Sequence, residues 1–146
     1  MNTMLVLLLL AVSTVPPETS SRSSCPEEVQ ATATAYRLSE LPQNIVDDLL
    51  LLTQNEIADS NAPLLQTDAP TAAERNHATV RFAQALLFRD MWLVQFEVTM
   101  FSDVRTVSYV RDSEGRFQRS PRHYFHGPAC ASIRAALSGV TTPRDF

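Results

Sequence analysis

The sequence contains no lysine, only three glycines and only two cysteines in 146 residues. All twelve basic residues are arginines, a bias typical of GC-rich genomes, so we expect a bacterial source. Charged residues make up 19% of the chain and hydrophobic residues 45%, which excludes a disordered low-complexity chain. No repeat of the kind that solenoid proteins show is present. These properties indicate one ordinary globular domain.

Common catalytic and cofactor motifs are also missing. The sequence has no Gly-x-Ser-x-Gly, no Gly-rich phosphate-binding loop and no His-Glu-x-x-His. In a strand, His123 and His126 would lie on opposite faces, and only His77 remains as a third histidine, so we predict neither a metal site nor a cofactor. The net charge of -4 argues against a nucleic-acid partner, because such binding depends on basic residues that neutralise phosphates.

One long apolar run lies near the N-terminus. Met4–Val12 is nine residues without charge, whereas a membrane-spanning helix needs about 20. This length fits a secretory signal, and Ala11 and Ser13 are small residues placed for cleavage after Ser13. We predict a signal peptide over 1–13, a flexible leader over 14–24 and a periplasmic or secreted protein with no stable membrane span. Because the first three residues carry no positive side chain, an uncleaved N-terminal anchor is the alternative.

The two cysteines frame the predicted domain, which covers residues 25–140 and leaves 141–146 as a loose tail. In an exported protein an even number of cysteines favours a disulfide, here between Cys25 and Cys130. The alternative is two buried free thiols. A bond across so long a loop would restrict the unfolded chain strongly.

Two helices are predicted with some precision. Pro42 and a capping Asn44 precede an amphipathic Leu-rich segment that we expect to end near Asp59. Pro128 opens a last helix, which Gly139 ends. Residues 26–38 carry both helical and strand-like signals and stay undecided.

Residues 79–126 have the pattern of a β-sheet. Their β-branched and aromatic residues are interrupted at Arg89-Asp90, Ser102-Asp103 and 112–115, which predicts four antiparallel strands joined by hairpins. The predicted fold class is therefore α+β, a four-stranded antiparallel meander packed against the Leu-rich helix and the C-terminal helix. In the register that these turns imply, one face is apolar and forms the core, with Trp92, Val94, Phe96, Val98, Met100, Leu87, Val107 and Tyr109.

The opposite sheet face holds the predicted binding site. The predicted register brings Glu97, Ser108 and Arg119 into one row across three strands, and this row depends on pairing Arg111 with Arg116. Convergent polar groups among apolar walls are typical of ligand pockets. The alternative is a half-exposed face with a surface ion pair. Further polar side chains surround the row, namely Gln84, Gln95, Thr99 and Thr106.

We expect a non-catalytic binding domain that holds a small anionic or amphipathic ligand, or a protein partner, at this face. The alternative is a small hydrolase or isomerase with Glu97 as general base under the long connection 59–78. A third class is a structural or inhibitor-type protein that uses an exposed edge strand. No resemblance to a known family is evident, and neither the ligand's identity nor the oligomeric state follows from the sequence.

Overall fold

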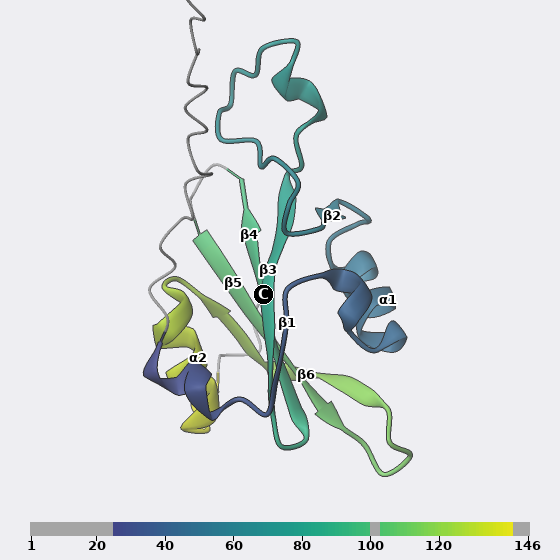
Figure 1. Ribbon diagram of the computed structural model, residues 1–146, viewed down its shortest axis with the longest axis vertical. Helices are drawn as coiled ribbons and strands as arrows, with labels where there is room; N and C mark the ends of the chain where they lie inside the picture. Colours follow the sequence, from purple (N-terminus) through teal and green to yellow (C-terminus); the bar gives the residue numbers. More distant parts are fainter. Residues whose placement is uncertain (1–24, 100–102, 142–146) are drawn as a thin grey trace, which may run out of the picture.

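The computed structural model describes residues 25–99 and 103–141 (Figure 1). Its strands are β1 (Ala33–Ala35), β2 (Ile57–Ala58), β3 (Val80–Phe88), β4 (Met91–Val98), β5 (Asp103–Arg111) and β6 (Phe117–His126). Its α-helices are α1 (Gln43–Leu52) and α2 (Ala129–Leu137), and short 3-10 helices cover Pro26–Gln30, Leu38–Glu40 and Glu74–Asn76. The predicted signal peptide and leader, and residues 142–146 of the predicted tail, lie outside the described residues.

A six-stranded sheet forms the centre of the fold. Strands β1, β3, β4, β5 and β6 pair in that order and antiparallel, while β2 pairs with β3 in parallel. The fold is α+β, as predicted, but a four-stranded sheet is wrong because β1 and β2 both add to β3. These two strands are three and two residues long, too short for a detectable period. The undecided segment contains both a 3-10 helix and strand β1.

The two α-helices lie on opposite sides of the sheet (Figure 1). Side chains alternate along β4, so that Trp92, Val94 and Phe96 pack on the α1 side while Leu93 packs on the α2 side. Val107 and Tyr109 share the α1 side, with Leu87 and Val98 packed against the same cluster, which confirms these parts of the predicted core face. Met100, also predicted there, lies outside the described residues. The opposite face was predicted to hold a ligand pocket or, as the alternative, to be half exposed. Instead, α2 and the neighbouring 3-10 helix cover part of it with a second apolar cluster, which contains Cys25, Leu86, Leu93, Phe125, Ile133 and Ala136.

Helix α1 begins two residues earlier than predicted and also ends earlier. Its N-cap is Pro42 and not Asn44, whose side chain donates to the carbonyl of Phe117 at 2.5 Å. Ile45 and Leu49 are fully buried against the sheet. After Leu52 the backbone turns left-handed at Gln54 (φ 53°) and Asn55 (φ 64°). The amide of Asn55 then donates to the carbonyl of Leu50 at 2.7 Å, which closes the helix. A helix reaching Asp59 is therefore wrong.

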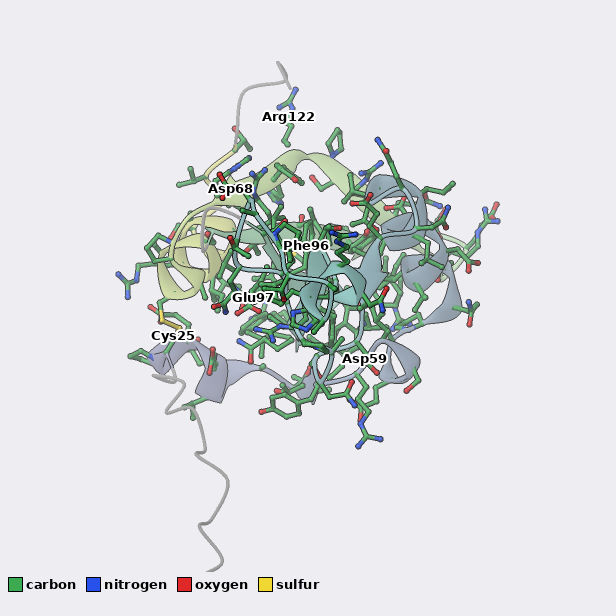
Figure 2. The ribbon with its side chains drawn as sticks, turned by 90° about the horizontal axis from the view of Figure 1, so that it is seen from above. Cys25, Asp59, Asp68, Phe96, Glu97 and Arg122 are labelled. Carbon is green, nitrogen blue, oxygen red and sulfur yellow. A yellow bond between two sulfur atoms is a disulfide. The ribbon has the colours of Figure 1, made fainter. Side chains whose placement is uncertain are left out.

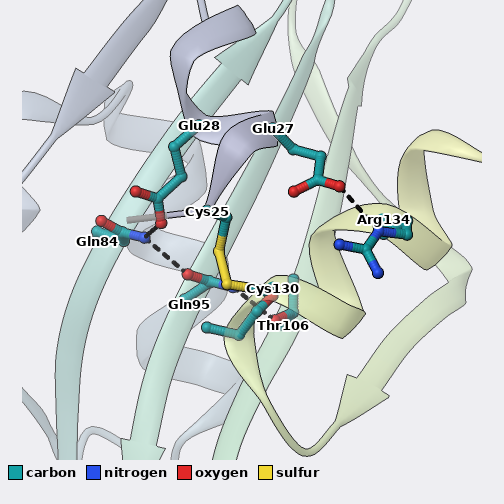
Figure 3. The surroundings of a disulfide bond; sticks show 9 residues. Cys25, Glu27, Glu28, Gln84, Gln95, Thr106, Cys130 and Arg134 are labelled. Atoms are coloured by element: carbon teal, nitrogen blue, oxygen red, sulfur yellow. Dashed lines mark hydrogen bonds and ion pairs between the residues drawn. A yellow bond between two sulfur atoms is a disulfide. The ribbon is translucent and has the colours of Figure 1, made fainter. Parts of the chain in front are cut away.

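The predicted disulfide is confirmed (Figure 3). Cys25 and Cys130 are bonded with their Cα atoms 5.5 Å apart, and the bond fastens the start of the described chain to α2. Arg134 of α2 donates to Glu27 at 2.8 Å, and this hydrogen bond lowers the pKa of the Glu27 carboxyl. As predicted, α2 follows Pro128, and Gly139 takes up a left-handed conformation (φ 73°) just beyond its end. None of the helices described is both long and apolar enough to cross a membrane.

The register of the first hairpin is partly as predicted. Phe88 lies opposite Met91 and Gln84 opposite Gln95. A bulge between Phe82 and Gln84 then shifts the register, so that Arg81 rather than Phe82 lies opposite Glu97.

The next two registers differ from the predictions. Between β4 and β5 the pairing moves by four residues and Trp92 lies opposite Tyr109, which leaves each side chain on its predicted face. Between β5 and β6, Arg111 pairs with Phe117 instead of Arg116. The loop gains one residue because the Asp112 carboxylate accepts the backbone amides of residues 114 and 116, both at 2.9 Å. Each β6 residue near this loop therefore lies on the face opposite to the one predicted.

Candidate functional site

The row predicted to bind a ligand does not form. Glu97 lies opposite Arg81 on β3 and Val104 on β5, and Ser108 lies opposite Leu93. Arg119 lies opposite Tyr109 and so belongs to the α1 side of the sheet. The one-residue shift around Asp112 thus puts the guanidinium of Arg119 on the opposite side of the sheet from the carboxylate of Glu97.

Glu97 has a different partner. Its Oε2 accepts hydrogen bonds from the Arg81 guanidinium, 2.8 Å from Nε and 2.5 Å from Nη2. The Nη1 of Arg81 also donates to the carbonyl of Ala62 at 3.2 Å, which anchors the connection 59–78 beside this pair. Glu97 is thus part of a charge-assisted contact that holds the loop against the sheet.

The predicted glutamines form a buried polar ladder (Figure 3). Gln84 donates to Glu28 at 2.8 Å and to Gln95 at 3.0 Å, and Gln95 donates to Thr106 and to the carbonyl of Ala129, both at 3.2 Å. Gln95 and Thr106 have at most 1% of their surface exposed. These contacts join the sheet to the 3-10 helix Pro26–Gln30 and to α2, the two segments that cover this face, so the ladder has a structural role.

Thr99 was predicted to face Thr106 but lies just beyond the end of β4. Its amide donates to the carbonyl of Thr79 at 2.9 Å. The partner of Thr106 across the strands is Gln95.

Ser108 has a partner that the sequence did not suggest. Its hydroxyl lies 2.8 Å from Nδ1 of His123, and the register of β5 against β6 shifts at this point. β6 is an edge strand, and Pro121 lies in its irregular stretch, where a missing amide is tolerated. Burial lowers the pKa of His123. Because Ser108 is fully buried, its hydroxyl is inaccessible as a nucleophile.

The irregular stretch of β6 helps to form a groove on the α1 side of the sheet. Its volume is about 610 Å³, within the range of about 300–1,000 Å³ that is usual for small-molecule sites. Helix α1 contributes one wall, and β5 and β6 contribute the rest. The residues that line this groove, called here the β6 groove, are Leu52, Arg105, Val107, Arg119, Ser120, Pro121, His123, Tyr124 and His126.

The polar groups of the β6 groove are mainly hydrogen-bond donors. Nη1 of Arg105 lies 3.4 Å from the Tyr124 hydroxyl and 3.3 Å from Nε2 of His126. Arg119 lies near the other end of the groove on β6, and more than a third of its side chain is exposed. The lining includes two arginines, two histidines and no carboxylate. This composition suits an anionic group.

A carboxylate below the groove holds Arg119 in place. Oδ2 of Asp48 on α1 lies 3.3 Å from Nε of Arg119 and accepts a hydrogen bond from the Tyr109 hydroxyl at 2.8 Å. Burial raises the pKa of Tyr109 well above its usual value, and the hydrogen bond to Asp48 is the second largest cause of this shift. Tyr109 is therefore a neutral donor that fixes Asp48, and Asp48 in turn orients Arg119.

A second, smaller cavity adjoins the β6 groove and has a volume of about 280 Å³. It shares Leu52, Arg105 and Tyr124 with the groove, so the two spaces lie next to each other at the C-terminal end of α1. Its other lining residues are Thr53, Gln54, Glu56, Val80, Phe96 and Val98.

Sequence reasoning identified Arg119 as a site residue but missed most of the groove. The position of Arg105 could have been predicted from strand alternation. Residues 105, 107 and 109 lie on the same face of one strand, so Arg105 belongs to the end of the predicted core face. Pro121 also had a usable signal, because proline inside a strand indicates an edge or a bulge. The contribution of Leu52 depends on how α1 packs, which no local pattern predicts.

Within residues 25–99 and 103–141, no group of three His, Cys, Asp or Glu side chains is placed to hold a metal ion. Comparison of the chain with protein-family models, with curated proteins and with solved structures finds no match.

Proposed function

We propose that this protein is a non-catalytic binding domain whose β6 groove holds a small anionic, amphipathic ligand. The observation that carries the proposal is the lining of the groove, which contains Arg105, Arg119, two histidines and no carboxylate. Apolar surface from Leu52 and Pro121 lies beside these groups. Such a mixture favours an acid group attached to an apolar body over a fully hydrated inorganic anion.

The site moves from the face predicted from the sequence, but the expected ligand class stays the same. Arg119 is the residue that both interpretations share. The glutamines and Thr106 support the groove indirectly, because their ladder fixes β4 and β5 beneath α2. A periplasmic or secreted location is part of the proposal, and the disulfide between Cys25 and Cys130 is compatible with it.

The enzyme alternative has weaker support. A general base must be within reach of a substrate proton, whereas Oε2 of Glu97 accepts two hydrogen bonds from Arg81. One observation in its favour is that the connection 59–78 does lie next to this pair, through Ala62. Hydrolysis that depends on Glu97 would therefore support this alternative and count against the binding proposal.

Isothermal titration with chain-matched probes tests the proposal. Octanoate carries an anionic head, octanol a neutral head and octyltrimethylammonium a cationic head on the same alkyl chain. We expect octanoate to bind at least about tenfold more tightly than either of the others, a difference of about 1.4 kcal/mol. Equal binding of all three would show a merely apolar surface, and absence of octanoate binding would refute the proposal.

Two variants locate the site. Arg119→Gln should weaken octanoate binding about fivefold, because it removes a partly exposed charge that faces the groove. Arg122→Gln is the matched control, since Arg122 lies on the same strand, does not line the groove and extends from the outside of the molecule (Figure 2). Equal effects of the two variants would indicate general charge attraction instead of a site.

A further inference from the structure

A second space adjoins the β6 groove. The smaller cavity shares Leu52, Arg105 and Tyr124 with the groove and lies toward the start of β3 and the end of β4. The two spaces can be compared by their positions along β5. Arg119, in the β6 groove, lies opposite residue 109 of this strand, and Val98, in the smaller cavity, lies opposite residue 103, which is six residues away. At about 3.4 Å per residue, the two ends are on the order of 20 Å apart along the strand direction. A compact anion would leave one end empty.

The two ends differ in charge. The β6 groove contains Arg119 and two histidines, whereas the smaller cavity contains Glu56 and Gln54. The C-terminal end of α1 adds to this contrast, because the last carbonyls of a helix carry a partial negative charge and Thr53, its C-cap, lines the smaller cavity. Arg105 lies at the junction of the two spaces.

The wall beside Glu56 has an uncommon backbone. Gln54 and Asn55 are consecutive non-glycine residues with φ values of 53° and 64°. This left-handed turn closes α1 and places Glu56 directly after it, on the wall of the smaller cavity. Oε2 of Glu56 accepts a hydrogen bond from the Thr79 hydroxyl at 2.7 Å, which fixes the carboxylate against the start of β3.

We infer that the ligand is a linear zwitterion, with its anionic group among the arginines of the β6 groove and a cationic group, such as an amine, at Glu56. This inference rests on the proposed function, because the anionic end uses the same groove. The inference adds Glu56 as a second residue that recognises the ligand, and it requires a ligand long enough to reach both ends. A ligand that is too short reaches one end only, and a dicarboxylate meets like charge at Glu56.

The test compares ω-aminocarboxylates with simple carboxylates of equal length, from hexanoate to hexadecanoate, by isothermal titration at low salt. We expect the terminal amine to strengthen binding about threefold once the chain spans both ends, and to have no effect on shorter chains. A contact with an exposed carboxylate gives a gain of this size, and salt screens it. The matching dicarboxylates should bind more weakly than the monocarboxylates.

Glu56→Gln locates the second point. This variant should abolish the gain from the amine while octanoate binding stays within twofold of wild type, and its side-chain carbonyl can still accept from Thr79. Asp68→Asn removes the same charge from the connection 59–78, does not line either cavity and should leave the gain intact. Carboxylate binding without an amine gain at any length, or a gain that survives Glu56→Gln, would overturn the inference while the proposed function stands. Absence of all carboxylate binding would refute the proposed function itself.

Discussion

Arg119 and Asp48 pair across the interface between β6 and α1, with Nε of the guanidinium 3.3 Å from Oδ2 of the carboxylate. The same Oδ2 accepts the buried hydroxyl of Tyr109, so three elements meet at one oxygen atom. The pair orients Arg119 beside the β6 groove, but it also neutralises part of the charge that a ligand would contact. Asp48 therefore competes with an anionic ligand for Arg119.

Asp48→Asn should strengthen octanoate binding about threefold. The amide oxygen can still accept from Tyr109, whereas the negative charge beside Arg119 is gone. The matched control is Asp47→Asn, which removes the same charge from an exposed neighbour on α1 and should leave the affinity unchanged. Weaker binding to Asp48→Asn would mean that the carboxylate is needed to hold Arg119 in its binding position.

The disulfide should account for much of the domain's stability. Replacing both Cys25 and Cys130 by serine removes a crosslink between residues 105 positions apart and should lower the free energy of unfolding by about 4 kcal/mol, through a less restricted unfolded chain. Urea titrations with and without reductant provide the measurement. The wild type should lose stability in reductant and the double variant should not. A wild-type midpoint that is unchanged by full reduction would contradict this account.

The polar ladder predicts that replacing Gln95 by leucine, a side chain of similar size, lowers the stability of the fold substantially. Gln95→Leu keeps the approximate size of the side chain. It leaves the carbonyl of Ala129 and the hydroxyl oxygen of Thr106 without the donor that Gln95 provides, so the free energy of unfolding should fall by about 2 kcal/mol. Gln118→Leu is the control, because Gln118 is exposed and its hydrogen bond to Asp112 lies at the surface. The control should change the stability by less than about 0.5 kcal/mol. Similar losses in both variants would contradict the structural role of the ladder.

The pKa of His123 predicts how stability depends on pH. Burial holds this pKa below its ordinary value of 6.5, so the folded state favours the neutral imidazole. On acidification through about 6.5 the unfolded chain takes up a proton before the folded one, and stability falls. Because His123 is only partly buried, we expect a loss of at most about 1 kcal/mol between pH 7.5 and 5.5. Urea titrations of wild type and His123→Asn at both pH values measure it, and an equal pH dependence in the two proteins would contradict the assignment.

Local patterns in the sequence predict the elements well and their relative placement poorly. The turn at Arg89-Asp90, a Leu-rich helix soon after Pro42 and the helix after Pro128 follow from short-range signals, and the structure contains all three. The disulfide follows from an even count of cysteines in a chain predicted to be exported.

The candidate site depends on longer-range geometry. The Asp112 side chain accepts two backbone amides and lengthens one loop by a residue, which alone turns Arg119 to the other face. The bulge at Ala83 shifts the pairing of Glu97 in the same way. These two events also bring Phe82 and Phe117 to the core face, although the predicted register put them on the opposite one. The core face of β4 and β5 was predicted correctly because the pairing of these two strands moved by an even number of residues, whereas the row of site residues was not. That α1 and α2 lie on opposite faces depends on tertiary packing.

The most direct test compares Arg119→Gln with Glu97→Gln in the same octanoate titration. The register predicted from the sequence put these residues in one pocket, whereas the structure puts them on opposite sides of the sheet. Our account predicts that Arg119→Gln weakens octanoate binding about fivefold and that Glu97→Gln changes it by less than twofold. Equal weakening by both variants, or weakening by Glu97→Gln alone, would contradict the assignment of the β6 groove as the binding site.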